Sequence, residues 1–226
     1  MKRLAYLIVI FILSCGYQKP SNGEKYRAQD GIEINPNIIS EISRLSTKKP
    51  EKNSVIRYKP SETIPGAFET YDSIVGGTKF KYVSEKLAYE IIDKYFQNVK
   101  DSKNYLYLTN LDFDGNYNSY YDIVIAPVTD QWELIKFVGT EPVNYDLTTK
   151  DVINWFKERQ KEFDFEIIVA DLDRIEAKIE TEPKSYKKLG KEIYKFCPDV
   201  IDQGHSDMGE LIEFLKSSKR MWFWWD

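Results

Sequence analysis

The densest group of reactive side chains lies in a short polar stretch near the C-terminus. Cys197 and Asp199 are followed by His205 and Asp207, and His205 is the only histidine in the chain. A thiolate, carboxylates and an imidazole are ligands that Zn²⁺ accepts, provided that at least three converge at about 2.0–2.3 Å. These four residues are therefore our candidates for a catalytic or zinc-binding site.

The same stretch also has the composition of a loop between two helices. Pro198 would end the first helix, and Ser206 or Asp207 would cap the second. A nucleophilic pair of Cys197 and His205 would need a thiol with a lowered pKa, and nothing in the sequence indicates one. We therefore favour a structural role for this stretch and keep a metal-assisted hydrolase as the alternative.

A second group of oxygen donors surrounds Gly115. Asp and Asn alternate there as in calcium-binding loops, in which alternate side chains point inward and glycine permits a sharp turn. The Glu that closes an EF-hand is replaced by Ile123, and Asp-Gly-Asn segments also form ordinary hairpin turns. We favour the turn. The calcium candidates are Asp112, Asp114, Asn116, Asn118 and Asp122.

The beginning of the chain carries a third chemically informative pattern. Residues 2–3 are basic, residues 4–13 are apolar, and residues 12–15 read Ile-Leu-Ser-Cys. This order is typical of a secretion signal, and an apolar run of about 10 residues is too short to span a membrane, which takes about 20. Residues 12–15 resemble the lipobox of bacterial lipoproteins.

The lipobox resemblance implies how the protein is processed and where it is located. Residues 1–14 would be removed as a signal peptide, and Cys15 would carry acyl chains, such as palmitate, that anchor the protein in the bilayer. With Cys15 acylated, Cys197 has no partner for an intramolecular disulfide. We expect a lipid-anchored protein of the bacterial cell envelope, with its folded part outside the cytoplasm.

Composition excludes several classes of protein. The chain is 42% hydrophobic and 30% charged, so it should fold rather than remain disordered. Its 32 basic and 36 acidic side chains argue against a nucleic-acid-binding protein. We find no glycine-rich phosphate loop and therefore expect no nucleotide cofactor; calcium and zinc are the metal hypotheses.

The apolar pattern predicts the elements that position these groups. Residues 15–58 are rich in Lys, Asn, Ser and Pro and are expected to form a tether containing one short helix. Residues 59–226 are expected to form a single α+β domain, a mainly antiparallel sheet with packed helices. Helical spacing predicts helices at 36–45, 84–99, from 148 onward, 186–196 and from 206 onward. Alternating or β-branched runs predict strands at 105–108, 121–126, 132–138, 165–169, 174–180 and 222–225.

Two of these strands carry further expectations. Charged and hydrophobic residues alternate over 174–180, which follows an expected turn at 171–173, so one face of this strand should be exposed to water. The aromatic residues at 222–225 predict a final strand that is covered on both faces.

Short motifs follow one another from Gly139-Thr140 to the last residue. In this order and spacing, residues 121–226 resemble the bacterial domain-of-unknown-function family 4253, and the similarity extends back towards Ser84. This family has no established activity, so the resemblance implies a fold and a domain boundary but no catalytic residue. The motif residues, for which we expect structural roles, are Asn144, Tyr145, Asp146, Cys197, Pro198, Asp199, Asp202, Gln203, Gly204, Trp224, Trp225 and Asp226.

Two classes of function follow from these patterns. The first is a non-enzymatic binding or interaction module at the cell envelope, which should expose an apolar or aromatic patch to a protein or glycan partner. The second is a metal-assisted hydrolase that uses the loop from Cys197 to Asp207, whose side chains would have to converge in one pocket.

Overall fold

The computed structural model describes residues 26–27, 33–65 and 67–225, so the expected signal peptide, Cys15 and Asp226 lie outside the described residues. The main strands are β3 (Glu51–Pro60), β4 (Phe68–Ser84), β5 (Tyr105–Phe113), β6 (Ser119–Ala126), β7 (Phe165–Ala170), β8 (Arg174–Ile179) and β9 (Arg220–Trp224). The α-helices are α1 (Pro36–Leu45), α2 (Glu85–Asp101), α3 (Gln131–Val138), α4 (Thr149–Gln160), α5 (Tyr186–Phe196) and α6 (Met208–Ser218). Shorter elements are β1 (Tyr26–Arg27), β2 (Glu33–Ile34), η1 (Val143–Tyr145) and η2 (Val200–Gly204).

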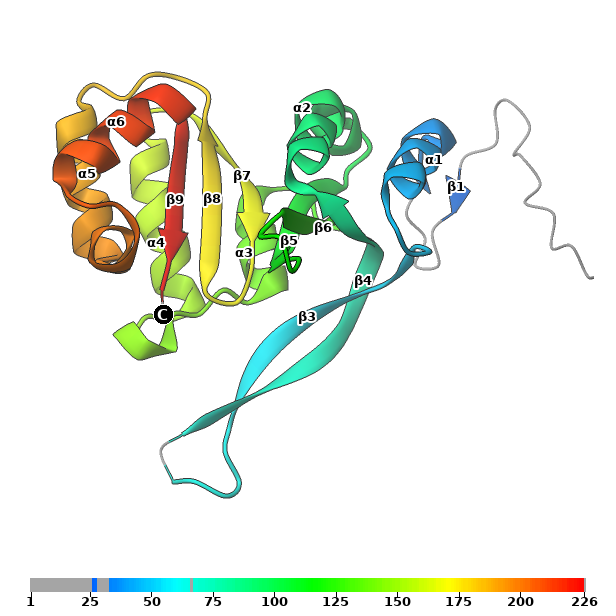
Figure 1. Ribbon diagram of the computed structural model, residues 1–226, viewed down its shortest axis with the longest axis horizontal. Helices are drawn as coiled ribbons and strands as arrows, with labels where there is room; N and C mark the ends of the chain where they lie inside the picture. The colour runs from blue at the N-terminus through cyan, green and yellow to red at the C-terminus, as the bar shows by residue number, and fades with distance from the viewer. Residues whose placement is uncertain (1–25, 28–32, 66, 226) are drawn as a thin grey trace, which may run out of the picture.

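The seven main strands form one sheet in the order β3-β4-β6-β5-β7-β8-β9 (Figure 1). Neighbouring strands are antiparallel except β5 and β7, which are parallel. The predicted α+β class is confirmed. The helices expected at 36–45, 84–99, from 148, 186–196 and from 206 are also present. Within the described ranges, none of the helices has the length and apolar content needed to cross a membrane.

Each face of the sheet has its own apolar core. On one face, residues such as Ile123 of β6 pack with Ile42 of α1 and Ile91 of α2. On the other face, Val124 packs in the core that contains Phe156 of α4. Because successive side chains of a strand point to opposite faces, adjacent residues of β6 belong to different cores. The sheet is thus the middle layer of the domain.

Residues 132–138 form a helix, so the strand expected there is wrong. The Asp130 carboxylate accepts hydrogen bonds from the backbone N–H groups of Trp132 and Glu133, both at 2.8 Å. Gly139 ends the helix in the left-handed region, with a φ of 78°. The buried residues of α3 recur at helical spacing. This spacing, with a cap at one end and glycine at the other, outweighs the strand propensity of the aromatic and β-branched residues.

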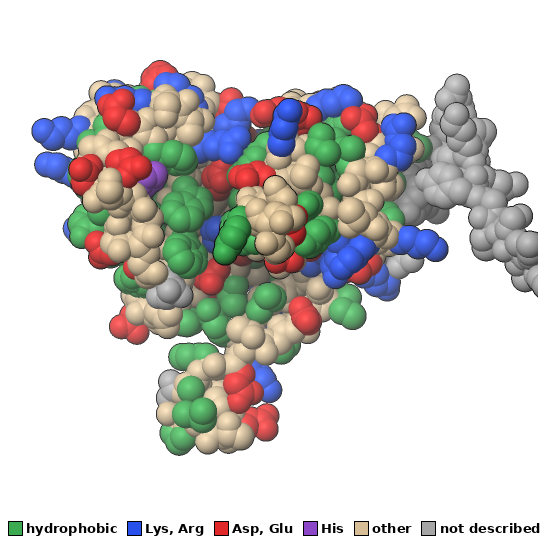
Figure 2. Space-filling view, viewed as in Figure 1, with side chains coloured by type: hydrophobic (Ala, Val, Ile, Leu, Met, Phe, Trp, Pro, Cys, Tyr) green, Lys and Arg blue, Asp and Glu red, His purple; other side chains and the backbone are tan. Residues whose placement is uncertain are grey.

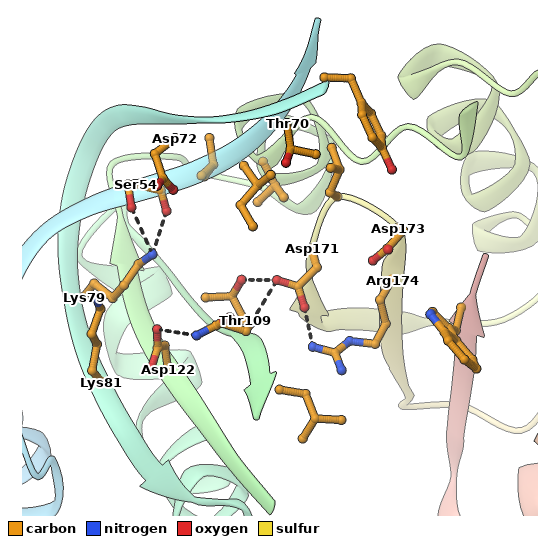
Figure 3. A pocket seen from close by; sticks show the side chains of 18 residues that line it. Ser54, Thr70, Asp72, Lys79, Lys81, Thr109, Asp122, Asp171, Asp173 and Arg174 are labelled. Atoms are coloured by element: carbon orange, nitrogen blue, oxygen red, sulfur yellow. Dashed lines mark hydrogen bonds and ion pairs between the residues drawn. The ribbon is translucent and has the colours of Figure 1, made fainter. Parts of the chain in front are cut away.

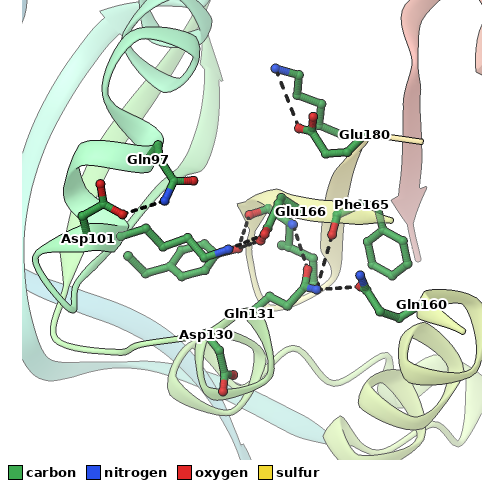
Figure 4. A network of polar contacts seen from close by, with 12 residues as sticks. Gln97, Asp101, Asp130, Gln131, Gln160, Phe165, Glu166 and Glu180 are labelled. Atoms are coloured by element: carbon green, nitrogen blue, oxygen red, sulfur yellow. Dashed lines mark hydrogen bonds and ion pairs between the residues drawn. The ribbon is translucent and has the colours of Figure 1, made fainter. Parts of the chain in front are cut away.

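The side chain of Gln131 joins α3 to strand β7 (Figure 4). Strands β5 and β7 are paired at Leu108 and Val169. Further along β7, the buried Gln131 accepts a hydrogen bond from the Ile167 N–H at 3.1 Å and donates one to the Phe165 carbonyl at 3.4 Å. The Gln131 side chain thus bonds to backbone groups of β7 that a neighbouring strand would otherwise bind, and it holds α3 against the sheet.

Strands β3 and β4 extend together away from the body as a two-stranded arm, residues 54–74 (Figure 1). Residues 51–58, which were expected to belong to the tether, therefore form an edge strand of the main sheet. The composition of β3 explains the error. It is an edge strand, half of its ten residues are Glu, Lys, Asn or Arg, and polar residues of this kind are common both in edge strands and in linkers.

Strand β8 is more buried than its alternating sequence predicts. Arg174 and Glu176 are only 9% and 5% exposed, so the expectation that this face is exposed to water is wrong at these two positions. It holds at the other end, where the side chains of Lys178 and Glu180 are 40% and 48% exposed. Their cross-strand partners on β9 are Trp224 and Trp222. From α2, the hydroxyl of Tyr89 donates a hydrogen bond to Glu176 at 2.7 Å. Large neighbouring side chains therefore cover the charged face of β8 at its Arg174 end.

Strand β9 is fully covered on one face only. Phe223 and the following Trp225 are buried, whereas Trp222 and Trp224 are half-buried. The predicted alternation is correct, but complete cover on both faces is not found.

Candidate functional site

A cavity of about 500 Å³ lies where the arm leaves the body (Figures 2 and 3). One wall comes from β3 and β4, and the other from β5, β6, the β7–β8 turn and the end of β9. The charged side chains that line it are Asp72, Lys79, Lys81, Asp122, Asp171, Asp173 and Arg174.

The parallel pair of strands explains why polar groups meet here. Asp171 directly follows β7, and Thr109 lies on β5 just beyond the pair of Leu108 and Val169. Since parallel neighbours point their carboxyl ends to the same edge, these residues share one end of the sheet, which is where open sheets with parallel strands usually bind ligands. Arg174, the first residue of β8, lies at the same edge, where β8 begins.

Asp171 is the centre of one polar network. One carboxylate oxygen accepts hydrogen bonds from the Thr109 hydroxyl and, at 2.9 Å, from the Asn110 N–H. The other oxygen accepts from the guanidinium of Arg174, which also lies over the ring of Tyr121, 5.5 Å from its centroid. The carboxylate therefore holds the β7–β8 turn against β5 and compensates the buried guanidinium charge.

Lys79 and Asp122 form a second buried group. The Lys79 ammonium is held by the Ser54 carbonyl at 2.7 Å. The Asp122 carboxylate accepts from the Tyr82 N–H at 3.0 Å and from the Asn110 side-chain amide at 3.2 Å. Burial lowers the pKa of Lys79 and raises the pKa of Asp122. Perturbed pKa values of this kind are concentrated in functional sites.

The structure places the reactive residues of the Cys197–Asp207 loop in separate structural roles. Cys197 is buried, its Sγ donates to the Trp224 carbonyl at 3.1 Å, and burial raises its pKa to about 12. Asp207 caps α6 by accepting from the Glu210 N–H at 2.9 Å. The ring of His205 packs on Phe214, with the centroids 5.0 Å apart, and burial lowers its pKa.

Asp199 is also buried, and it is bound by protein groups. It accepts a hydrogen bond from Gln203 at 3.2 Å, and its hydrogen bond with Tyr145 contributes to the raised pKa of that phenol, after the larger effect of burial. In the part of the chain that the structure describes, no three His, Cys, Asp or Glu side chains are placed to hold a metal ion. Among the motif residues, Asp199 thus contacts Tyr145 and Gln203, and Cys197 contacts Trp224.

The calcium candidates are divided between two places. Asp114 accepts from the Asn116 N–H at 2.8 Å and from the Asn118 N–H at 3.0 Å, which closes the β5–β6 turn. Asp112 accepts from the N–H of the next residue. Asp122 instead belongs to the cavity, and pairs across the strands with Thr109.

Sequence reasoning missed the cavity. The segment from Asp171 to Arg174 was expected to be only a turn and the start of a half-exposed strand. Two carboxylates directly after a buried strand, followed by a guanidinium, are the local signal that could have identified it. No local signal connects these residues to Lys79, because they line the same cavity only through the pairing of β4 with β6 and of β5 with β7.

Comparisons with known proteins identify one domain. Residues 122–226 match the family described as "Domain of unknown function (DUF4253)". No curated protein and no solved structure matches the chain. The matched segment supplies the Asp122, Asp171 and Arg174 side of the cavity, whereas the arm lies outside it.

Proposed function

We propose that this protein is a lipid-anchored binding module of the bacterial cell envelope, which binds its partner in the cavity and along the adjoining face of the arm. The proposal combines the lipobox-like segment that ends at Cys15 with the shape and composition of the arm. The binding is non-enzymatic.

The exposed apolar residues of the arm are the observation that carries the proposal. Eight large hydrophobic side chains are exposed in the described part of the chain, and five of them lie between residues 56 and 74. Figure 2 shows hydrophobic side chains on the surface of this projection. They are Ile56, Ile64, Phe68, Tyr71 and Ile74, which are 47%, 62%, 55%, 44% and 76% exposed.

Part of this apolar surface is continuous with the cavity. Directly paired residues of antiparallel strands share a face of the sheet. Ile56 is paired with Asp72, and Tyr58 with Thr70, and all four residues line the cavity. Phe68, which is paired with Pro60, lies on the same face of the arm, at the next position further from the body. A partner seated in the cavity would therefore also cover apolar residues of the arm.

The exposed position of the arm also favours a partner. An isolated two-stranded ribbon is only marginally stable in water, whereas this one continues the main sheet and is held to α3 by Arg57, which donates to the Phe137 carbonyl at 2.8 Å. Exposed apolar residues that gather on one projection usually mark an interaction surface. Strand β3 is also an edge of the sheet, with backbone groups available to an added strand.

Lipid anchoring is tested by metabolic labelling with an alkyne analogue of palmitate in a bacterial host. We expect the label on the wild-type protein and on Cys197→Ala, and its loss from Cys15→Ser. The Cys197 variant is the matched control, because it removes the other cysteine of the chain. Undiminished labelling of Cys15→Ser would refute the anchor.

Partner binding is tested by photo-crosslinking in cells. A benzoyl-phenylalanine is placed at Phe68 or at Ile74, and at Tyr194 of α5 as an exposed control. We expect a discrete adduct of higher mass at the two arm positions and none at Tyr194. Equal crosslinking at all three positions, or none on the arm, would contradict the proposed binding surface.

A further inference from the structure

We propose that the half of the cavity around Asp173 binds a cation on an aliphatic stem, an alkylammonium or alkylguanidinium group. This inference rests on the proposed function, since it specifies what enters the cavity of the binding module. The group could belong to a free amine or to a Lys or Arg side chain of a bound polypeptide, and the two sources share the same chemistry.

The balance of charge in the lining favours a cation. Four aspartates and three basic side chains line the cavity, which leaves one negative charge in excess. Each basic group has a partner within the protein. Arg174 is bonded to Asp171 and also interacts electrostatically with Asp173. Lys79 is held by the Ser54 carbonyl, and Lys81 forms an ion pair at 2.6 Å with Glu51, which lies outside the lining. An anionic ligand would have to compete with these contacts.

Aromatic residues and carboxylates line the same cavity. Tyr58 of the arm and Trp224 of β9 both line it, and so does Asp173. Burial raises the pKa of Tyr58, and the negative charges of Asp173 and Glu141 add to that effect, so both carboxylates act on this ring. Cations bind favourably over the faces of Trp and Tyr rings, and more strongly where water is excluded.

The remaining lining is suited to an aliphatic stem. Val138 and Leu172 line the cavity from the body side, and Ile56 lines it from the arm. A volume of about 500 Å³ falls within the range of small-molecule sites, about 300–1,000 Å³. Figure 3 shows Asp72 on the arm and Asp173 on the opposite wall, so carboxylates are present on both sides of the space.

The experiment is calorimetric titration of the full-length protein in detergent with agmatine, which carries a guanidinium on a four-carbon stem. Glutarate, of similar length and opposite charge, is the control probe. The blocked peptide acetyl-Gly-Arg-Gly-amide tests the polypeptide source. We expect agmatine or the peptide to bind and glutarate not to bind, with weaker binding at high ionic strength because the attraction is electrostatic.

Two pairs of variants test where the cation binds. Asp173→Asn should weaken binding about tenfold, whereas Asp101→Asn, which removes the same charge from the end of α2, should not. On the arm, Tyr58→Leu should weaken binding severalfold and Tyr58→Phe should retain it, because phenylalanine keeps the ring face. The Tyr58 pair leaves the β7–β8 turn intact, so it remains informative if Asp173→Asn unfolds.

Each outcome distinguishes this inference from the proposed function. Binding of agmatine but not the peptide indicates a free amine, the reverse indicates a polypeptide, and either result supports a cation site if the variants behave as expected. Binding of glutarate instead, or of neither cationic probe, would overturn the inference. If the arm positions still crosslink in cells, the binding module itself stands.

Discussion

Cys197 lies in the core that contains Phe156, and its burial determines its reactivity. The thiol is bonded to the Trp224 carbonyl, and its pKa is raised to about 12. The thiolate is the reactive form, and the raised pKa keeps this thiol almost entirely protonated at pH 8. We predict that Cys15→Ser, which has Cys197 as its single thiol, reacts negligibly with an aromatic disulfide reagent when folded and completely when denatured. Prompt reaction of the folded protein would restore a nucleophilic role for Cys197.

Asp122 should give the protein a pH-dependent stability of unusual sign for a carboxylate. Burial raises its pKa above the ordinary 3.8, so the folded protein holds this proton more tightly than the unfolded chain. The contribution of Asp122 to stability is therefore present at low pH and is lost as the pH rises through its folded-state pKa. In urea unfolding at several pH values, the stability of Asp122→Asn relative to wild type should increase as the pH rises above the ordinary carboxyl pKa of about 4.

The control for this prediction is Asp101→Asn. Asp101 is exposed at the end of α2, where it accepts a hydrogen bond from Gln97 at 2.7 Å. The stability of Asp101→Asn relative to wild type should not increase with pH in the way that is expected for Asp122→Asn. If the two variants show the same pH dependence, burial of Asp122 is not its cause.

At the scale of elements, the course of β4 depends on one glycine. Pairing of β4 with β6 begins at Thr78, next to Gly77, whose φ is +110°. A Cβ added there would lie 2.5 Å from the Ile125 carbonyl oxygen. We predict that Gly77→Ala destabilises the protein by about 1–3 kcal/mol in urea unfolding, since both backbone strain and a steric clash oppose it. A stability equal to wild type would mean that the strand can shift to remove the clash.

Gly115 offers a matched control in the β5–β6 turn. A Cβ added there would meet no atom within 4 Å. Gly115→Ala should therefore change the free energy of unfolding by less than about 0.5 kcal/mol. The difference between the two alanine variants isolates the effect of the close approach at Gly77 from the general effect of replacing glycine.

At the scale of the whole molecule, the matched segment does not contain a continuous sheet. Residues 122–226 include β7, β8, β9 and most of β6, but β5 lies between β6 and β7 in the sheet. We predict that a fragment of residues 122–226 fails to unfold cooperatively, because the missing strand leaves β6 and β7 without their shared neighbour. A fragment that begins at residue 84 restores α2 and β5 and should unfold cooperatively. Near-ultraviolet circular dichroism during urea unfolding tests both fragments, and cooperative unfolding of the shorter one would disprove this dependence.

Local patterns in the sequence determined most of the elements. Apolar residues at helical spacing predicted α1, α2 and α5, and a capping box formed by Thr148 and Asp151 starts α4 where the residues predicted it. These features depend on neighbours within a few residues, so they can be read from the chain directly. The α+β class followed from the same patterns. The strand expected at 132–138 was wrong because strand propensity there competed with the cap and the helical spacing that formed α3.

Only the tertiary structure decided where the polar residues meet. Asp171 is bonded to Thr109, which lies 62 positions away in the sequence, because β5 and β7 are parallel neighbours. Lys79 is bonded to Ser54, which lies 25 positions away, because β4 pairs with β3. The burial of Arg174 and Glu176 likewise depends on β9 and α2, which lie far away in the sequence. Composition alone could not identify this cavity, because its walls come from separate elements and their charged side chains are brought together only when the chain folds.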